Sequence, residues 1–169
     1  DKEKTAESQK EQSVFNTVLS EAQVSLNSAA VSARYNEEIA NYESQAKMLG
    51  GSLSSLAQQY GTDEGGFKEM VMASVRAQLE EEVVIDTIAQ QEGLTLTDED
   101  RQGYAENNGS DVDTLVGIYG QETFDQMVER SKVLKFLADN AVEEQLPEET
   151  EAAETETEET AAETTEAAQ

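Results

Sequence analysis

The sequence contains no Cys, no His and no Trp, and it has a single Pro among 169 residues. Without Cys it cannot form disulfides, zinc–thiolate sites or a thiolate nucleophile. Without His it lacks the commonest general base near neutral pH and every serine triad that uses this base. These absences favour a binding protein over an enzyme, and no catalytic residue is assigned.

Basic residues are also scarce, since 11 Lys and Arg face 37 Asp and Glu, for a net charge of −26. Nucleic acids and anionic membranes are bound through Lys and Arg, so neither is an expected partner. No apolar run approaches the roughly 18 residues that a membrane-spanning helix needs. The first residue is Asp and no signal-peptide pattern follows it, so we interpret the chain as a mature or excised piece of a longer protein.

Residues 147–169 differ sharply in composition from the rest of the chain. They contain only Glu, Ala, Thr, Gln and Pro, with nine Glu and no basic residue. A segment without large apolar side chains cannot offset its ordering entropy, so we expect a disordered, solvating tail. The alternative is an acidic tail that competes for a basic partner surface. We therefore divide the chain into a helical domain at 1–146, which still carries −17, and an acidic tail at 147–169.

The domain at 1–146 has the pattern of an all-α protein. Apolar residues recur every three or four positions, and Ala, Glu, Gln and Leu are abundant. We expect seven helices, at about residues 2–23, 28–49, 52–60, 67–91, 98–107, 110–119 and 122–144. The predicted N-caps are Asn27 or Ser28, Thr97 and Ser110.

Glycines and lysines refine this helical pattern. Gly50 and Gly51 are expected to form a left-handed cap that ends the second helix, and Gly93 to end the longest one. The pair Gly65 and Gly66 is interpreted as a helix stop or hinge. On the last helix, Lys132 and Lys135 are expected on the side away from its apolar stripe.

Two runs of carboxylates, at residues 80–82 and 98–100, raise the question of calcium binding. Neither has the alternating oxygen ligands and the glycine of a calcium loop. We interpret the first run as a charged helix face and the second as a helix cap. A catalytic pair of carboxylates is the weakest hypothesis, and we expect neither a metal nor a cofactor.

Met and aromatic residues follow the helical spacing, and core packing is their default interpretation. Met70 and Met72, however, lie on different faces of one helix and cannot both enter a single narrow core. Met is adaptable, and Met-rich surfaces bind varied partners. The sequence therefore predicts apolar surface that stays partly uncovered.

Three stretches together resemble the C-terminal domain of bacterial trigger factor, a ribosome-associated chaperone. They read NTVLSEAQVSLNSAAVSARYNEEIANYESQAKMLGGSLSSLAQQYG at 16–61, FKEMVMASVRAQLEEEVVIDTIAQQEGLTLTDED at 67–100 and YAENNGSDVDTLVGIYGQETFDQMVERSKVLKFLADNAV at 104–142. The first is similar to the family's arm helices, the second to its long helix, and the third to its short helices, its Tyr-Gly turn and its final helix. The resemblance spans about residues 12–142.

The resemblance implies an irregular array of helices with arms, of the trigger factor C-terminal and SurA-like kind. Such a body binds unfolded or nascent polypeptide without ATP. The implied client contacts are Tyr35, Ile39, Tyr42, Met48, Leu49, Met70, Met72 and Tyr119. The family implies a cytoplasmic location; because periplasmic SurA-type chaperones share the fold, an extracytoplasmic location is the alternative if the parent has a signal peptide.

The sequence also departs from the trigger factor pattern. The Pro that usually precedes the first arm is replaced by the step from Leu26 to Ser28, and neither the ribosome-docking signature nor the aromatic-rich prolyl isomerase domain is present. Ribosome contact and isomerisation would therefore belong to other parts of a parent protein. The alternative function is a helical adaptor that binds one folded protein partner.

Overall fold

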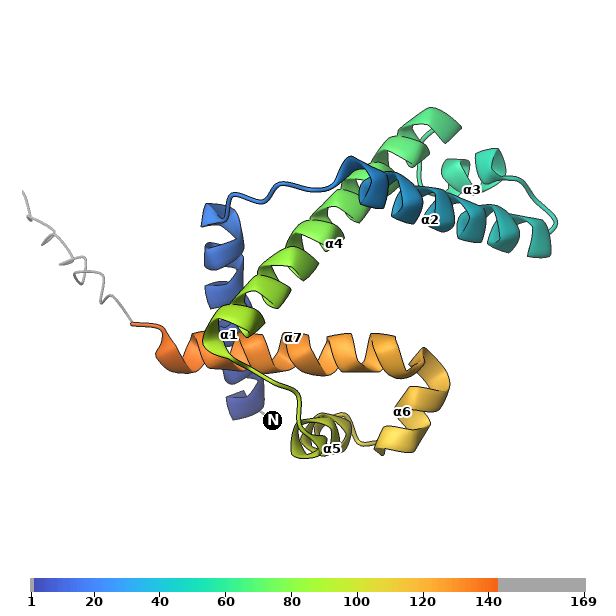
Figure 1. Cartoon of the computed structure of the whole chain (residues 1–169). Helices are drawn as coiled ribbons and strands as arrows, with labels where there is room; N and C mark the ends of the chain where they lie inside the picture. Colours follow the sequence, from blue (N-terminus) through green and yellow to red (C-terminus); the bar gives the residue numbers. More distant parts are fainter. Residues whose placement is uncertain (1, 143–169) are drawn as a thin grey trace, which may run out of the picture.

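The structure describes residues 2–142, and the regular secondary structure in that range is α-helical. This computed structural model has seven α-helices and no strand in that range (Figure 1). The helices are α1 (Lys2–Glu21), α2 (Ser28–Met48), α3 (Leu53–Gln59), α4 (Glu64–Glu92), α5 (Asp98–Asn107), α6 (Val112–Tyr119) and α7 (Gln121–Asn140). The predicted all-α fold is confirmed, whereas the predicted tail at 147–169 lies outside the described residues. None of these helices is both long enough and apolar enough to cross a membrane.

Several helix ends form as the sequence predicts. The side chain of Asn27 caps α2 by accepting hydrogen bonds from the backbone N–H groups of Ala29 and Ala30, at 2.8 and 3.4 Å. Thr97 caps α5 in a reciprocal arrangement with Asp100. At the end of α2, Gly50 adopts a φ of 74° and the backbone N–H of the next glycine donates to the carbonyl of Ala46. This closure satisfies carbonyls that would otherwise lack a partner.

Two predicted helix starts are wrong. The longest helix begins at Glu64 because the Asp63 side chain accepts a hydrogen bond from the N–H of Gly66, at 2.8 Å. The two glycines at 65–66 therefore lie in its first turn and form neither a stop nor a hinge. A Cβ at Gly66 would clash with the Thr62 hydroxyl, which gives this glycine a local packing reason. Likewise Asp111, one residue after the predicted Ser110, caps α6.

Two separate hydrophobic cores lie along α4. The first joins the N-terminal half of α4 to α2 and α3, and its buried members are Val31, Ala46, Leu53, Leu56, Ala57, Phe67, Val71 and Val75. The second joins the C-terminal half of α4 to α1 and α7, and its buried members are Phe15, Val84, Ile85, Ala89, Val133 and Leu134. We call α2, α3 and the N-terminal half of α4 the arm. The C-terminal half of α4, together with α1, α5, α6 and α7, is the body. Within the described residues, α4 is the only helix that both units share.

Helices α5 and α6 complete the body by packing against α7. Phe124 of α7 is fully buried, and its ring meets the edge of Tyr104 of α5 with 6.0 Å between the ring centroids. The Arg101 guanidinium donates to the Asp125 carboxylate at 2.7 Å. Apolar packing and this ion pair together fix α5 on the N-terminal half of α7.

The position of Lys132 also differs from the expectation. Its ammonium group donates to the Asp100 carboxylate at 2.5 Å and to the carbonyl of Thr95 at 2.8 Å, so it faces α5 and is only partly exposed. The long Lys side chain reaches from the edge of α7 to a neighbouring helix, which a helical projection of α7 alone does not reveal. Lys135 is exposed, as predicted, and pairs with Asp139 one turn later.

Figure 1 shows how the two units are set at an angle. Helix α4 (green) crosses α7 (orange) where the second core lies, and the two helices diverge from that crossing. Helices α2 and α3 lie toward the far end of α4, and α6 lies at the far end of α7. The molecule therefore has an open angle with one unit on each side.

Candidate functional site

The eight predicted contact residues fall into a covered and an exposed set. Tyr35, Ile39, Tyr42 and Met72 are partly buried and pack against the first core. Met48, Leu49, Met70 and Tyr119 are exposed, with relative exposures of 84, 73, 46 and 48%. Met70 and Met72 thus separate onto two faces, as their spacing requires. The structure places seven of the eight residues on the arm and only Tyr119 on the body.

The tip of the arm presents Met48 and Leu49 to solvent. They are the last residue of α2 and its C-cap, held in place by the glycine closure that follows. Beyond α3, Tyr60 is also exposed, while its ring lies 5.3 Å from that of Phe67 in the first core. Tyr60 is not among the predicted contacts, although its position just before Gly61, at the end of a short helix, was a signal for exposure.

Helix α6 is the second exposed apolar element. It is rich in apolar residues, yet none of its residues is fully buried. Ile118 is 65% exposed and Tyr119 follows it at the end of the helix. Gly117 beside them has open space where a side chain would be. The sequence predicted Tyr119 as a contact but missed Ile118, because the apolar pattern of α6 resembles that of a helix with a buried face.

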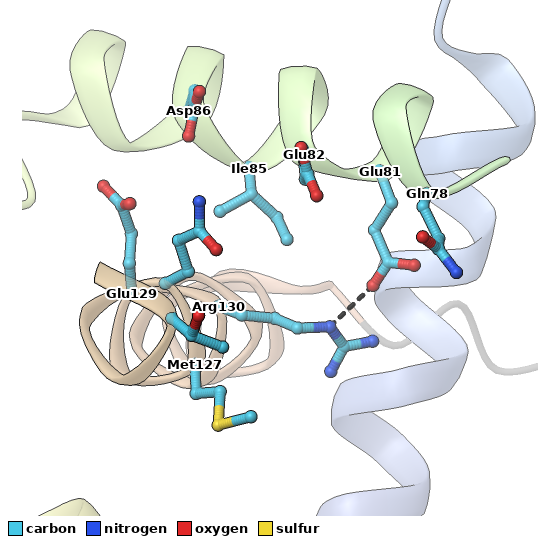
Figure 2. A pocket seen from close by; sticks show the side chains of 10 residues that line it. Gln78, Glu81, Glu82, Ile85, Asp86, Met127, Glu129 and Arg130 are labelled. Carbon is cyan, nitrogen blue, oxygen red and sulfur yellow. Dashed lines mark hydrogen bonds and ion pairs between the residues drawn. The ribbon is translucent and has the colours of Figure 1, made fainter. Parts of the chain in front are cut away.

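A cleft of about 250 Å³ lies in the angle between α4 and α7. We call it the α4–α7 cleft. It is lined by Gln78, Glu81, Glu82, Ile85 and Asp86 of α4 and by Thr123, Gln126, Met127, Glu129 and Arg130 of α7 (Figure 2). This cleft was not predicted from the sequence.

The buried apolar stripe of α4 is interrupted by polar residues in its middle, and the cleft lies at this interruption. On α4, Val75 is the last buried residue of the first core, with Leu79 packed against that core, and Val84 and Ile85 are the first buried residues of the second core. The stripe positions between them are Gln78 and Glu82, which border the cleft. Gln78 is exposed and Glu82 is partly exposed, so these polar side chains reach water between the two cores. The interruption in the apolar pattern therefore marks the junction of the two cores.

Two neighbouring carboxylates at this junction bind arginines from different helices. The Arg34 guanidinium of α2 donates to Glu82 at 3.2 Å. The Arg130 guanidinium of α7 donates to Glu81 at 2.6 Å (Figure 2). It also donates to the Gln12 side chain of α1 at 3.3 Å. These contacts fasten α4 to the helices of both units close to the point where they diverge.

Two other carboxylates of the cleft have no such partner. No ion pair within residues 2–142 involves Asp86 or Glu129. Burial raises the pKa of the Glu129 carboxyl, and the nearby charges of Asp86 and Asp125 raise it further. Among the described residues that line the cleft, Arg130 is the one cation, and it does not neutralise the excess of negative charge.

Two carboxylates of each run, at 80–82 and 98–100, have structural partners. Glu81 and Glu82 bind arginines, Asp98 pairs with Arg101 at 3.1 Å, and Asp100 serves the cap of α5. Within residues 2–142, no three acidic side chains come together in a way that could hold a metal ion. The second run is a helix cap, as the sequence indicated.

Comparison with known proteins extends these observations. Residues 1–149 match the family described as bacterial trigger factor protein C-terminus. Trigger factor from Oceanobacillus iheyensis is 27% identical over 125 residues, which cover 70% of this chain and 29% of that protein. The chain therefore spans less than a third of the length of that relative.

The fold has a counterpart among solved structures. Trigger factor domains from Thermotoga maritima superpose with a TM-score of 0.55 at 19% sequence identity, over 78% of this chain and 83% of that one. The family match takes in all seven described helices and both cores. The chain belongs to the bacterial trigger factor C-terminal family, which is the chaperone part of that protein and not its isomerase part.

Proposed function

We propose that the chain is an ATP-independent holdase that binds unfolded or nascent polypeptides. The observation that carries this proposal is the exposure of large apolar side chains on both sides of the open angle, at Met48 and Leu49 on the arm and at Ile118 and Tyr119 on the body. Single exposed apolar side chains are common on protein surfaces, so the proposal is supported by their occurrence as adjacent pairs, one on each unit.

The exposed apolar side chains on the arm and on the body suit a client without a fixed structure. An unfolded segment exposes apolar side chains at irregular intervals, and separate apolar sites on one frame can bind several of them at once. Methionine adapts its shape to varied partners, which fits Met48 and Met70. The net charge of −26 would keep the chain and its client in solution.

We centre the binding surface on the exposed members of the predicted set. Met48, Leu49, Met70 and Tyr119 would contact clients directly, joined by Ile118. The partly buried Tyr35, Ile39, Tyr42 and Met72 would support the arm and offer their exposed edges. We infer a cytoplasmic location and, through other parts of a longer parent, contact with the ribosome.

The proposal is tested by aggregation of a chemically unfolded enzyme diluted into buffer, followed by light scattering. An equimolar amount of the chain should suppress the scattering, and the combined replacement of Met48, Leu49, Ile118 and Tyr119 by Ser should remove most of the suppression. Val142→Ser is the control for exposed apolar surface elsewhere, because Val142 is also exposed, at 93%, but lies beyond the end of α7. A folded chain that leaves the scattering unchanged would contradict the proposal.

The adaptor hypothesis makes the opposite prediction. An adaptor for one folded protein would bind that protein saturably and leave unfolded clients unaffected. The separation of the exposed apolar groups onto two units favours the holdase, because a single folded partner is usually held by one continuous apolar patch.

A further inference from the structure

The α4–α7 cleft combines an apolar wall with unneutralised charge at its edge. Ile85 is buried and forms part of the wall, together with the partly buried Met127. Asp86 of α4 and Glu129 of α7 lie in the left part of the view in Figure 2, while Arg130 points to the right, to Glu81. The Arg130 guanidinium also lies 5.6 Å from the centre of the Phe15 ring. Its charge therefore interacts with Phe15 and Glu81 and is directed away from Asp86 and Glu129.

This combination matches the chemistry of a long basic side chain. Lys and Arg have an apolar stem and a charged head, and they bury the stem while the head stays near water. A volume of about 250 Å³ accommodates a side chain of this length but not a folded segment. The apolar wall suits the stem, and the two carboxylates suit the head.

We propose that the α4–α7 cleft binds a lysine or arginine side chain of a client polypeptide, with its stem against Ile85 and Met127 and its cationic head between Asp86 and Glu129. The inference rests on the proposed function and deepens it. Clients would be apolar segments that include a basic residue, with the apolar residues bound by the arm tip and α6.

Charge complementarity selects this occupant over two others. A second copy of the chain would bring another charge of −26 to an acidic cleft, which like-charge repulsion opposes. The segment at 147–169 of the same chain has nine Glu and no basic residue, so it cannot supply the cation. Burial is the main cause of the raised pKa of Glu129 and repulsion from Asp86 and Asp125 adds to it; a bound cation would offset both effects.

The test measures binding of three labelled, unstructured peptides to the full chain by fluorescence anisotropy at low salt. The peptides share one apolar sequence and differ only at the central residue, which is Lys, norleucine or Glu. Norleucine keeps the apolar stem without the charge. We expect the Lys peptide to bind about fivefold more tightly than the norleucine peptide, as a partly exposed ion pair allows. The Glu peptide should bind most weakly.

Two double variants test whether the preference for the Lys peptide arises in the cleft. The double variant Asp86→Asn with Glu129→Gln should make the Lys and norleucine peptides bind equally. The control Glu80→Gln with Glu122→Gln removes one charge from each of the same two helices, at exposed positions outside the cleft, and should retain the Lys preference. Circular dichroism on both variants verifies that they are folded.

Each outcome decides between distinct conclusions. A Lys preference that disappears only in the cleft variant supports the site. A preference that survives in the cleft variant, or its absence from the unmodified chain while all three peptides bind, overturns the site and leaves the proposed function intact. If none of the three peptides binds, the proposed function itself is contradicted.

Discussion

The arm and the body share α4, but the residues of the arm core are close together in the sequence and those of the body core are far apart. Every buried residue of the arm core lies between Val31 and Val75. The body core instead packs Phe15 of α1 against Val133 and Leu134 of α7, more than 100 residues later. The arm therefore closes through short connections, and the body only when both ends of the described chain meet.

This difference indicates where binding surface can be displayed at little cost to stability. The body is joined by contacts among α1, α4 and α7, whereas the arm shares only α4 with it and is otherwise linked by the connection at residues 22–27. A unit attached through one helix can open or change shape without separating the others. Seven of the eight predicted contacts lie on this more independent unit, which suits a surface for variable clients.

The largest effect is expected from Phe15→Ala in the body core. Phe15 is fully buried, so truncation should lower the free energy of unfolding by about 3–5 kcal/mol. Thermal denaturation measures the loss, and hydrogen exchange locates it. Exchange should increase in α1 and α7 more than in α2 and α3; an equal increase everywhere would show that arm and body form one cooperative unit.

Leu56→Ala tests the same comparison from the arm. Leu56 is 6% exposed in the first core, and its truncation should lower the free energy of unfolding by about 2–3 kcal/mol. The rise in hydrogen exchange should be confined to α2, α3 and the first half of α4. Loss of protection in α1 or α7 would contradict the separation of the two cores.

A smaller effect is expected from Arg130→Met, which keeps an apolar stem over Phe15 but removes the hydrogen bonds to Glu81 and Gln12. Because this ion pair is partly exposed, the loss should be about 1 kcal/mol and should fall at high salt. Arg76→Met is the matched control: it makes the same change of charge at an exposed position of α4 that does not line the cleft. Equal losses for the two variants would show that the bridge at the junction is not stabilising.

The smallest expected effect is a loss of stability of α5 at acid pH. Burial tends to raise the pKa of Asp100, but hydrogen bonds from Lys132 and Thr97 outweigh it and hold the pKa below its ordinary value of 3.8. A carboxyl whose pKa is lowered by folding stabilises the fold above its unfolded pKa and loses that contribution as pH falls through the folded value. The contribution should therefore be complete above about pH 5 and fade below pH 4.

This acid effect is measured by hydrogen exchange in α5 and its connection to α4 as a function of pH. The arm lacks this contact and serves as the internal reference. In Asp100→Asn the additional loss of protection in α5 below pH 4 should disappear. An unchanged pH dependence in that variant would assign the acid sensitivity to other carboxylates.

The helices themselves could be predicted because their signals are local. Apolar spacing, the cap residues Asn27 and Thr97, and the closing Gly93 act within a turn or two of each helix, and the structure bears them out. The start of α4 was missed because a glycine pair usually interrupts a helix, whereas here Asp63 caps the helix just before it.

The candidate site was less accessible from sequence. Whether Gln78 and Glu82 face solvent or a neighbour depends on which helices cover the middle of α4, and that follows from long-range packing. For the same reason Tyr35 and Tyr42 could not be distinguished from Met48, since all three lie on α2 and only their contacts separate covered from exposed. Met70 and Met72 were the exception, because their spacing of two residues is enough to place them on different faces of the helix.

The four methionines allow a direct test of whether exposed apolar side chains hold unfolded polypeptide. Methyl groups of Met48 and Met70 report on exposed positions, that of Met72 on the edge of the arm core, and that of Met127 on the cleft. When a permanently unfolded protein is added to chain labelled at the methionine methyls, the signals of Met48 and Met70 should shift or broaden strongly while that of Met72 changes little. Unchanged signals at Met48 and Met70, under conditions in which the client binds, would contradict the proposed surface.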